Sequence, residues 1–250
     1  MTEPPERLPD FPEEASGRFG YSVAKVTLAG IPFVGDALQE ILERAIGEPL
    51  KRRQEEWFRK IGKGLQELHE RLEGFDPRSL GDNPAFVGIV YEATDQAMRA
   101  QEEERLEALR NVVLNTAAGI AIDDVLRGRF MGYVGRFSTA HVHVLKAMDN
   151  PGASPAMVAQ AKGMTMGAFW PGLLVGLPEF GQREDLLEVI VAELEAERLI
   201  EKSSKVMMSG GSIMSQKSTT LGRAFLQFIS SPDSLSVSED RAVRAHDALR

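Results

Sequence analysis

The sequence predicts a mainly α-helical protein, and three observations support this class. From Leu50 to Leu72, apolar side chains recur at steps of three and four residues and leave a charged opposite face, which is the period of an amphipathic helix. Residues that favour helix starts precede such stretches, as at Asp36 and at Asn83 followed by Pro84. Strand-like patterns are confined to two short pieces near the end of the chain.

The composition is that of an ordinary globular protein, with 43% hydrophobic and 26% charged residues among 250, and it allows one large or two small domains. The absence of cysteine excludes disulfides, cysteine nucleophiles and thiolate metal sites. The acidic, proline-rich first residues lack the apolar run of a secretory signal. The longest uncharged apolar stretch, residues 26–35, is shorter than the ~20 residues that span a membrane. We therefore expect a cytoplasmic protein.

Helical signals dominate residues 18–134, which we predict to form a helical bundle or a long helical hairpin. A short apolar helix at 19–29 precedes a helix that is capped by Asp36. Pro49 stands where the first turn of a helix tolerates proline. A separate, long amphipathic helix is therefore predicted from Leu50 onward.

A further helix is predicted to start at Asn83, and the acidic run 102–104 is predicted to lie on a solvated face before the apolar pattern resumes at Leu106. Gly119 is expected to mark a boundary or a kink. The predicted core side of the helix from Asn83 carries six side chains: Phe86, Val87, Val90, Tyr91, Ala97 and Met98.

Residues 135–230 follow a different order of predicted elements. A helix capped by Ser138 ends at Asn150, a second cap at Ser154 starts a short helix, and a glycine-rich connection follows. Next come a longer helix, REDLLEVIVAELEAERLIEK, and two strand-like pieces, KVMM and SIMSQKS, whose joining glycines suit a β-hairpin. The last predicted helix is TTLGRAFLQFI.

This order of elements resembles a winged-helix domain. The resemblance rests on the helix ending in LEAERLI, the glycine-containing hairpin and the closing helix TTLGRAFLQFI. The whole chain also resembles bacterial proteins of unassigned function that join a helical N-terminal part to a winged-helix tail, which implies a bacterial cytoplasmic origin. The predicted segments are a disordered tail at 1–17, a helical domain at 18–134, a winged-helix domain at 135–230 and a flexible tail at 231–250.

Winged helices often read DNA with the helix before the wing, and the resemblance places this helix at about residues 184–198. Between residues 183 and 201, seven acidic side chains stand against two arginines. Like charge is repelled by the phosphates that dominate DNA affinity, so this helix disfavours DNA binding, as does the net charge of −8. The candidate nucleic-acid contacts near the wing are Lys202, Lys205, Lys217 and Arg223.

No catalytic, cofactor-binding or metal-ligating residue is predicted. The chain lacks phosphate-loop, dinucleotide-binding and nucleophile-elbow motifs. His141 and His143 are two residues apart, and this spacing points them in different directions on a helix. We therefore expect one packed and one exposed histidine rather than a zinc pair.

The apolar, glycine-containing segment at 19–47 admits two interpretations. It forms a helical hairpin buried under the long helices, or it inserts into a bilayer whose anionic headgroups attract the basic cluster that follows. Lys25, Asp36 and Glu40 within the segment favour burial in the protein. The candidate membrane or partner contacts are Ile31, Phe33, Val34, Lys51, Arg52 and Arg53.

These observations favour a non-enzymatic interaction or oligomerisation protein. Its helical domain would dock a protein partner or a second copy, and its acidic winged helix would serve as a dimerisation or partner module. One alternative is a winged-helix transcriptional regulator that binds DNA, which rests on the resemblance alone. A second alternative is a membrane-active bacterial defence effector, which rests on the apolar segment at 19–47.

Overall fold

The structure, a computed structural model, describes residues 36–120, 122–162, 164–201 and 207–232, and these residues are mainly helical. The predicted mainly α class is therefore confirmed. The chain divides into two units, and the boundary between them in the sequence falls between Glu56 and Trp57. The tail predicted at 1–17 and the helix predicted at 19–29 lie outside the described residues, as does nearly all of the tail predicted at 231–250.

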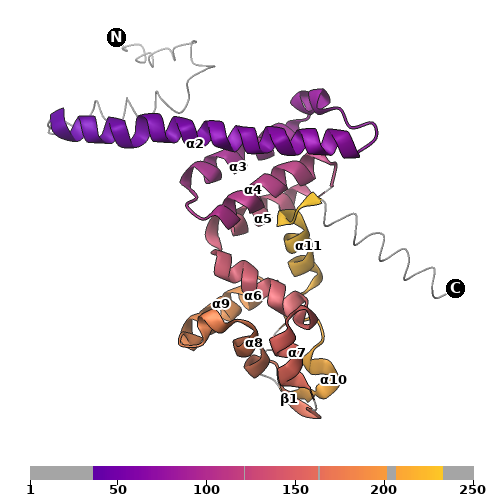
Figure 1. The fold of residues 1–250 in the computed structure, drawn as a ribbon. Coiled ribbons are helices and arrows are strands. Elements are labelled where there is room, and N and C mark those ends of the chain that lie inside the picture. The colour runs from indigo at the N-terminus through magenta and orange to yellow at the C-terminus, as the bar shows by residue number, and fades with distance from the viewer. Residues whose placement is uncertain (1–35, 121, 163, 202–206, 233–250) are drawn as a thin grey trace, which may run out of the picture. The chain divides into compact units, whose positions relative to one another are not determined.

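Helices make up both halves of the described chain, and its β-structure is one short antiparallel pair and one isolated bridge (Figure 1). The first half contains α2 (Asp36–Arg71), the 3-10 turn η1 (Pro77–Asp82), α3 (Pro84–Arg99), α4 (Glu103–Ala117) and α5 (Asp124–Arg136). The second half contains α6 (Thr139–Asp149), η2 (Pro151–Ala153), α7 (Pro155–Ala161), β1 (Met166–Ala168), α8 (Trp170–Gly176), η3 (Pro178–Phe180), α9 (Glu184–Ala196), β2 (Met207–Ser209), α10 (Gly210–Ile213) and α11 (Thr220–Ile229).

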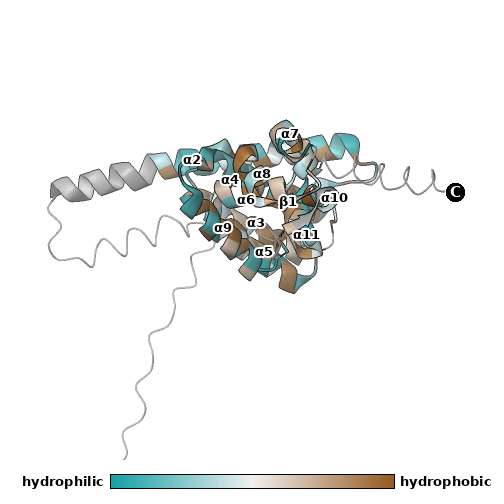
Figure 2. Cartoon of the chain, turned by 90° about the horizontal axis from the view of Figure 1, so that it is seen from below, coloured by the Kyte–Doolittle hydropathy of each residue, from teal (hydrophilic) through white to brown (hydrophobic). Residues whose placement is uncertain are grey.

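α2 is one continuous helix of 36 residues, so the prediction of a separate helix beginning after Pro49 is wrong. Proline inside a helix removes one backbone donor, but Pro49 is exposed, and water can hydrate the carbonyl left without a partner. Trp57, Ile61 and Leu68 are buried along one side of α2, and the rest of its described surface is mainly hydrophilic (Figure 2). No helix in the described part of the chain is both long and apolar enough to cross a bilayer.

The predicted helix caps are confirmed at several positions. Asn83, Ser138 and Ser154 are the N-cap residues of α3, α6 and α7, where short polar side chains satisfy free backbone donors. Gly119 follows the end of α4 with a φ of +77°, a conformation that glycine adopts without strain. The boundary predicted at Gly119 is therefore confirmed.

The predicted core face of α3 is partly wrong. Val87 and Tyr91 were assigned to the core, but they are 50% and 75% exposed. Ala97 is buried as predicted, and the helix also turns Ile89 and Ala93 inward; both alanines are fully buried. The small side chains of these alanines let α3 lie close to α4. Because this close contact has room only for small residues, the alanine face of α3 is buried, while the larger Val87 and Tyr91 face solvent.

The segment predicted as a glycine-rich connection after α7 has more structure than expected. Residues 166–168 form β1 and residues 170–176 form α8. Pro171 stands in the first turn of α8, where a helix does not use the backbone N–H that proline lacks. The helices predicted at residues 183–202 and 219–229 are confirmed as α9 and α11, but α9 ends at Ala196, before the predicted end, and Ile200 lies in a β-bridge.

The hairpin predicted between KVMM and SIMSQKS is not formed by the described residues. β2 pairs with β1 instead, with Gly167 opposite Met208, and the glycines expected in the turn begin α10. The antiparallel partner of β2 is thus β1, which lies in the segment predicted as a connection. A single bridge, Ile200 to Ser218, joins the chain on either side of this region.

One apolar core extends from α2 to α11. Near its centre, the ring centroid of Phe130 in α5 lies 5.5 Å from those of Phe225 and Phe228 in α11. The boundary predicted between residues 134 and 135 lies inside α5. α5 and α11 thus contribute to the same core from opposite sides of that predicted boundary.

Two buried asparagines of α4 bind the end of α11. The Nδ2 of Asn115 donates to the carbonyls of Gln227, Phe228 and Ser230 at 2.8 to 3.2 Å. The Nδ2 of Asn111 donates to the carbonyl of Ile229 at 3.0 Å. The last carbonyls of a helix have no partner within it, so α4 supplies the C-terminal cap that α11 lacks.

Candidate functional site

α9 presents an acidic face to solvent. Between its ends the helix carries five carboxylates and no lysine or arginine. Val189, which is 52% exposed, lies among these charges. The exposed residues that form this acidic face are Glu184, Asp185, Glu188, Val189, Ala192, Glu193 and Ala196.

Contacts on several sides fix the orientation of α9. Its inner side is buried in the core through Leu187, Ile190, Val191 and Leu194. On its flanks, Glu193 Oε2 lies 2.5 Å from Nε2 of His141, and Glu184 Oε1 accepts a hydrogen bond from Nε1 of Trp170 at 2.5 Å. Rotation of the helix would break these contacts, so the acidic face stays turned to solvent.

The C-terminal end of α9 is joined to α5 through Glu197. Its Oε2 accepts hydrogen bonds from Tyr133 Oη at 2.9 Å and from Arg129 Nη2 at 3.1 Å, and its Oε1 accepts from Arg136 Nη2 at 2.5 Å. These bonds, that from Tyr133 foremost, hold the pKa of Glu197 below its usual value against the opposing effect of burial. Burial in turn raises the pKa of Tyr133. One carboxylate therefore connects three side chains of α5 to α9.

Replacing Glu197 by glutamine is expected to lower stability at neutral pH and to leave a smaller deficit in acid. A carboxylate with a lowered folded-state pKa stabilises the fold above its ordinary value of 4.5, and this contribution is lost as the pH falls through the folded-state pKa. Urea unfolding of the variant and the wild type, from neutral to acidic pH, measures the difference. Glu195→Gln removes a neighbouring carboxylate outside this network and is the control. A Glu197→Gln deficit that stays constant with pH would contradict the expectation.

Lys217, a candidate nucleic-acid contact, lies in the interior. It is 3% exposed, and its Nζ donates to the carbonyl of Ser212 at 2.7 Å and to Oγ of Ser215 at 2.6 Å. The same Nζ lies 5.6 Å from the ring centroid of Phe169. Burial lowers the pKa of Lys217, an effect that the charge of Glu201 opposes. Because the ammonium of Lys217 is bound inside the protein, it is not available to contact phosphates. Lys217 is therefore not proposed as a contact for DNA.

The other candidate nucleic-acid contacts do not form a continuous basic surface among the residues that the structure describes. Lys202 and Lys205 lie outside the described residues. Arg223 is exposed on α11, and its guanidinium donates to three oxygens, those of Gln216, Ser218 and Thr220, at 3.1 to 3.2 Å. Its donors thus hold the turn before α11 together.

The candidate membrane or partner contacts fall into two groups. Ile31, Phe33 and Val34 lie outside the described residues. The basic cluster lies within α2, where Lys51 and Arg52 are exposed and Arg53 is half-buried. The structure therefore describes only the charged part of the surface that the sequence singled out.

His141 and His143 occupy different environments, as their spacing predicts. The ring of His141 stacks on Phe137 with centroids 4.8 Å apart, and its Nδ1 lies 2.9 Å from Oγ of Ser138. His143 is half-exposed, and its Nε2 lies 3.0 Å from Oε2 of Glu104. His141 is packed, as predicted, whereas His143 is half-exposed rather than fully exposed. Within the described ranges, no cluster of histidines and carboxylates is arranged to hold a metal ion.

The acidity of α9 is evident from the sequence, but the residues that anchor its C-terminal end are not. The available signal was the spacing of Arg129, Tyr133 and Arg136, which places them on one side of a helix. Nothing in the sequence pairs them with Glu197, because that contact joins separate helices. No family model, curated protein or solved structure matches the chain, so function is inferred from the geometry of this site.

Proposed function

We propose that the chain is a non-enzymatic interaction protein that self-associates, with the acidic face of α9 of one copy bound to a basic segment of a second copy. The observation that carries the proposal is the exposed face of α9, which has carboxylates around Val189 and no cation. Opposite charges across an interface steer association and fix its register. An exposed apolar residue within the charged face adds buried area when a partner covers it.

The chain supplies a segment of matching charge. Between Lys51 and Lys63, α2 carries six cationic and two anionic side chains, and Lys51, Arg52 and Arg59 are exposed. Phe58 lies among these cations and is 45% exposed, so it is available to pack against the apolar centre of the acidic face. A second copy thus offers the positive charge that α9 lacks and an apolar side chain, Phe58, that can pack against Val189.

The proposal includes a winged-helix-like module that serves docking rather than DNA reading in a bacterial cytoplasm. Its support is the order of α6, α7 and α9, followed by the bridge between Ile200 and Ser218 and then by α11. All charged side chains between Glu184 and Ala196, in the helix expected to meet DNA, are negative. Phosphates repel such a surface, whereas a cationic protein surface is attracted to it.

Light scattering of the purified chain at low and high salt tests this function. We expect a mass above that of one 27.5 kDa chain at low salt and a mass closer to one chain at high salt, because salt screens exposed charges. Replacing Asp185 and Glu188 by lysine is expected to give a monomer. Glu73→Lys, a reversal at an exposed residue outside α9, is the control and should associate as the wild type does.

A charge swap sharpens the test. Adding Lys51→Glu and Arg52→Glu to the α9 variant is expected to restore association, because the two charged surfaces are then exchanged. A wild type that is monomeric at low salt, or an α9 variant that still associates, would sink the proposal. Salt-sensitive, sequence-specific DNA binding would instead favour the regulator, and leakage of anionic vesicles would favour the membrane effector.

A further inference from the structure

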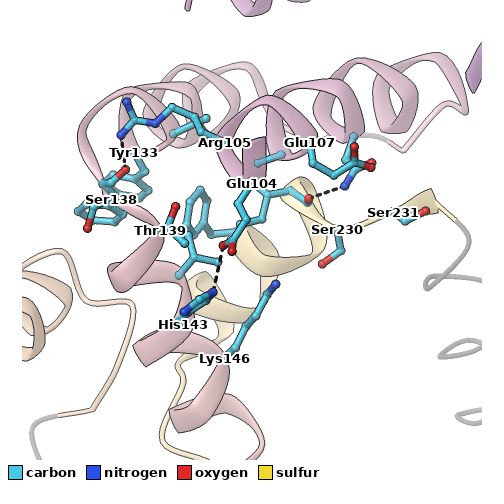
Figure 3. A pocket seen from close by; sticks show the side chains of 17 residues that line it. Glu104, Arg105, Glu107, Tyr133, Ser138, Thr139, His143, Lys146, Ser230 and Ser231 are labelled. Atoms are coloured by element: carbon cyan, nitrogen blue, oxygen red, sulfur yellow. Dashed lines mark hydrogen bonds and ion pairs between the residues drawn. The ribbon is translucent and has the colours of Figure 1, made fainter. Parts of the chain in front are cut away.

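A cavity of about 530 Å³ opens between α4, α5, α6 and the end of α11 (Figure 3). This volume lies within the range of small-molecule sites. Its walls come from helices on both sides of the boundary predicted at residues 134 and 135. None of its lining residues belongs to α9, so the cavity is separate from the acidic face described above.

The inner wall of the cavity is apolar. Val134 and Phe137 line it from the α5 side, Val142 from α6, and Phe225 and Ile229 from α11. These side chains also belong to the apolar core or pack against it, so their positions are fixed by the fold. A ligand with an apolar body would displace water from this wall, which is favourable.

The carboxylates that line the cavity have partners. Oε2 of Glu104 lies 3.0 Å from Nε2 of His143, as the dashed line in Figure 3 marks. Oε1 of Glu107 accepts a hydrogen bond from Nη1 of Arg110 at 3.1 Å. Both carboxylates are therefore engaged within the protein.

Two cations of the lining have no carboxylate partner among the residues that the structure describes. Arg105 donates from Nη2 to the carbonyl of Phe137 at 2.8 Å, while its Nε is buried without a hydrogen-bond partner. Lys146 is exposed, and its side chain extends toward the cavity (Figure 3). The lining carries two cations and two carboxylates. Both carboxylates have a side-chain partner, whereas neither cation has one among the described residues.

We propose that this cavity binds a small amphipathic carboxylate. The apolar body packs against Val142, Phe225 and Ile229, and the carboxylate pairs with the ammonium of Lys146 at the cavity mouth. The guanidinium of Arg105 adds positive potential in a partly buried place, where charges are weakly screened. An anion supplies the carboxylate partner that Lys146 and Arg105 do not have among the described residues, and hydrogen bonds between ionised groups are the stronger kind.

Calorimetric titration of the full chain with octanoate tests the proposal, with octanamide as a neutral probe of similar size and shape. We expect saturable binding of octanoate that weakens with salt, and binding of octanamide weaker by about tenfold or more. Lys146→Gln is expected to weaken octanoate binding by about tenfold, since an exposed lysine is lost without disturbing the core. Lys162→Gln, at an exposed lysine outside the lining, should bind octanoate as the wild type does.

Three outcomes would overturn the proposal. The first is the absence of saturable octanoate binding, which would show that the cavity has no such ligand. The second is equal binding of octanoate and octanamide, or no effect of Lys146→Gln, which would show that the site does not recognise the anion. The third is an equal loss in both lysine variants, which would indicate non-specific attraction to the surface. None of these outcomes bears on self-association through α9.

Discussion

Replacing Gly222 by alanine is expected to destabilise the protein by about 3 kcal/mol, because the site has no room for a side chain. Gly222 is buried in the first turn of α11. A Cβ at this position would lie 2.1 Å from the carbonyl oxygen of Leu199 and 3.0 Å from its carbonyl carbon. That carbonyl also accepts the N–H of Thr219 at 2.9 Å. The clash is therefore with hydrogen-bonded backbone, which cannot move aside as a flexible side chain can.

Urea unfolding of the variant and the wild type measures this effect, and the chain offers a matched control. Gly128 lies within α5, and a Cβ there would meet no atom within 4 Å. Gly128→Ala is expected to stabilise the protein by roughly 0.5 to 1 kcal/mol, because alanine favours the helix over glycine. If Gly222→Ala proves as stable as Gly128→Ala, the close approach of α11 to Leu199 is refuted.

Replacing Asn115 by aspartate is expected to have the second large effect, a loss of about 3 kcal/mol. The change removes the Nδ2 that donates to three carbonyls at the end of α11 and places oxygen against them. Asn115 is 1% exposed, so water cannot solvate the new charge. The carboxylate would also face the negative end of the α11 dipole.

The same substitution at Asn83 is the control, because the charge then meets the opposite end of a helix. Asn83 caps α3, and its Oδ1 accepts from the N–H of Ala85 at 3.0 Å. Aspartate keeps this acceptor and is favoured at a helix N-terminus, so Asn83→Asp should change stability by less than about 0.5 kcal/mol. Thermal or urea unfolding that finds equal losses for both variants would show that the α4–α11 contact does not depend on the amide donor.

The parts of the fold that the sequence predicts are those that depend on neighbouring residues. N-caps such as Asn83 and Ser138 act within one turn, and apolar periodicity acts within one helix. The core face of α3 was mispredicted because Val87 and Tyr91 are as apolar as the residues that are buried. Burial there depends on the fit between α3 and α4, which no local pattern encodes.

The candidate site, too, could be predicted only where it depends on neighbouring residues in the sequence. Counting charges was enough to predict that α9 is acidic, but it could not show which of the lysines that follow α9 are exposed. Lys217 is buried because β2 pairs with β1 and the chain folds back over Phe169. That pairing joins segments about forty residues apart, and strand pairing at such separation depends on the whole fold. The cavity lined by Arg105 and Lys146 likewise exists only where separate helices meet.

The amides of α4 also determine when the molecule can finish folding as it is made. The backbone carbonyls that accept hydrogen bonds from Asn111 and Asn115 lie 112 to 118 residues later in the chain. During translation, α4 and α5 therefore emerge from the ribosome with their shared apolar surface still uncovered, and contacts of such long separation form late. The nascent chain can complete its core only once the residues of α11 have left the exit tunnel.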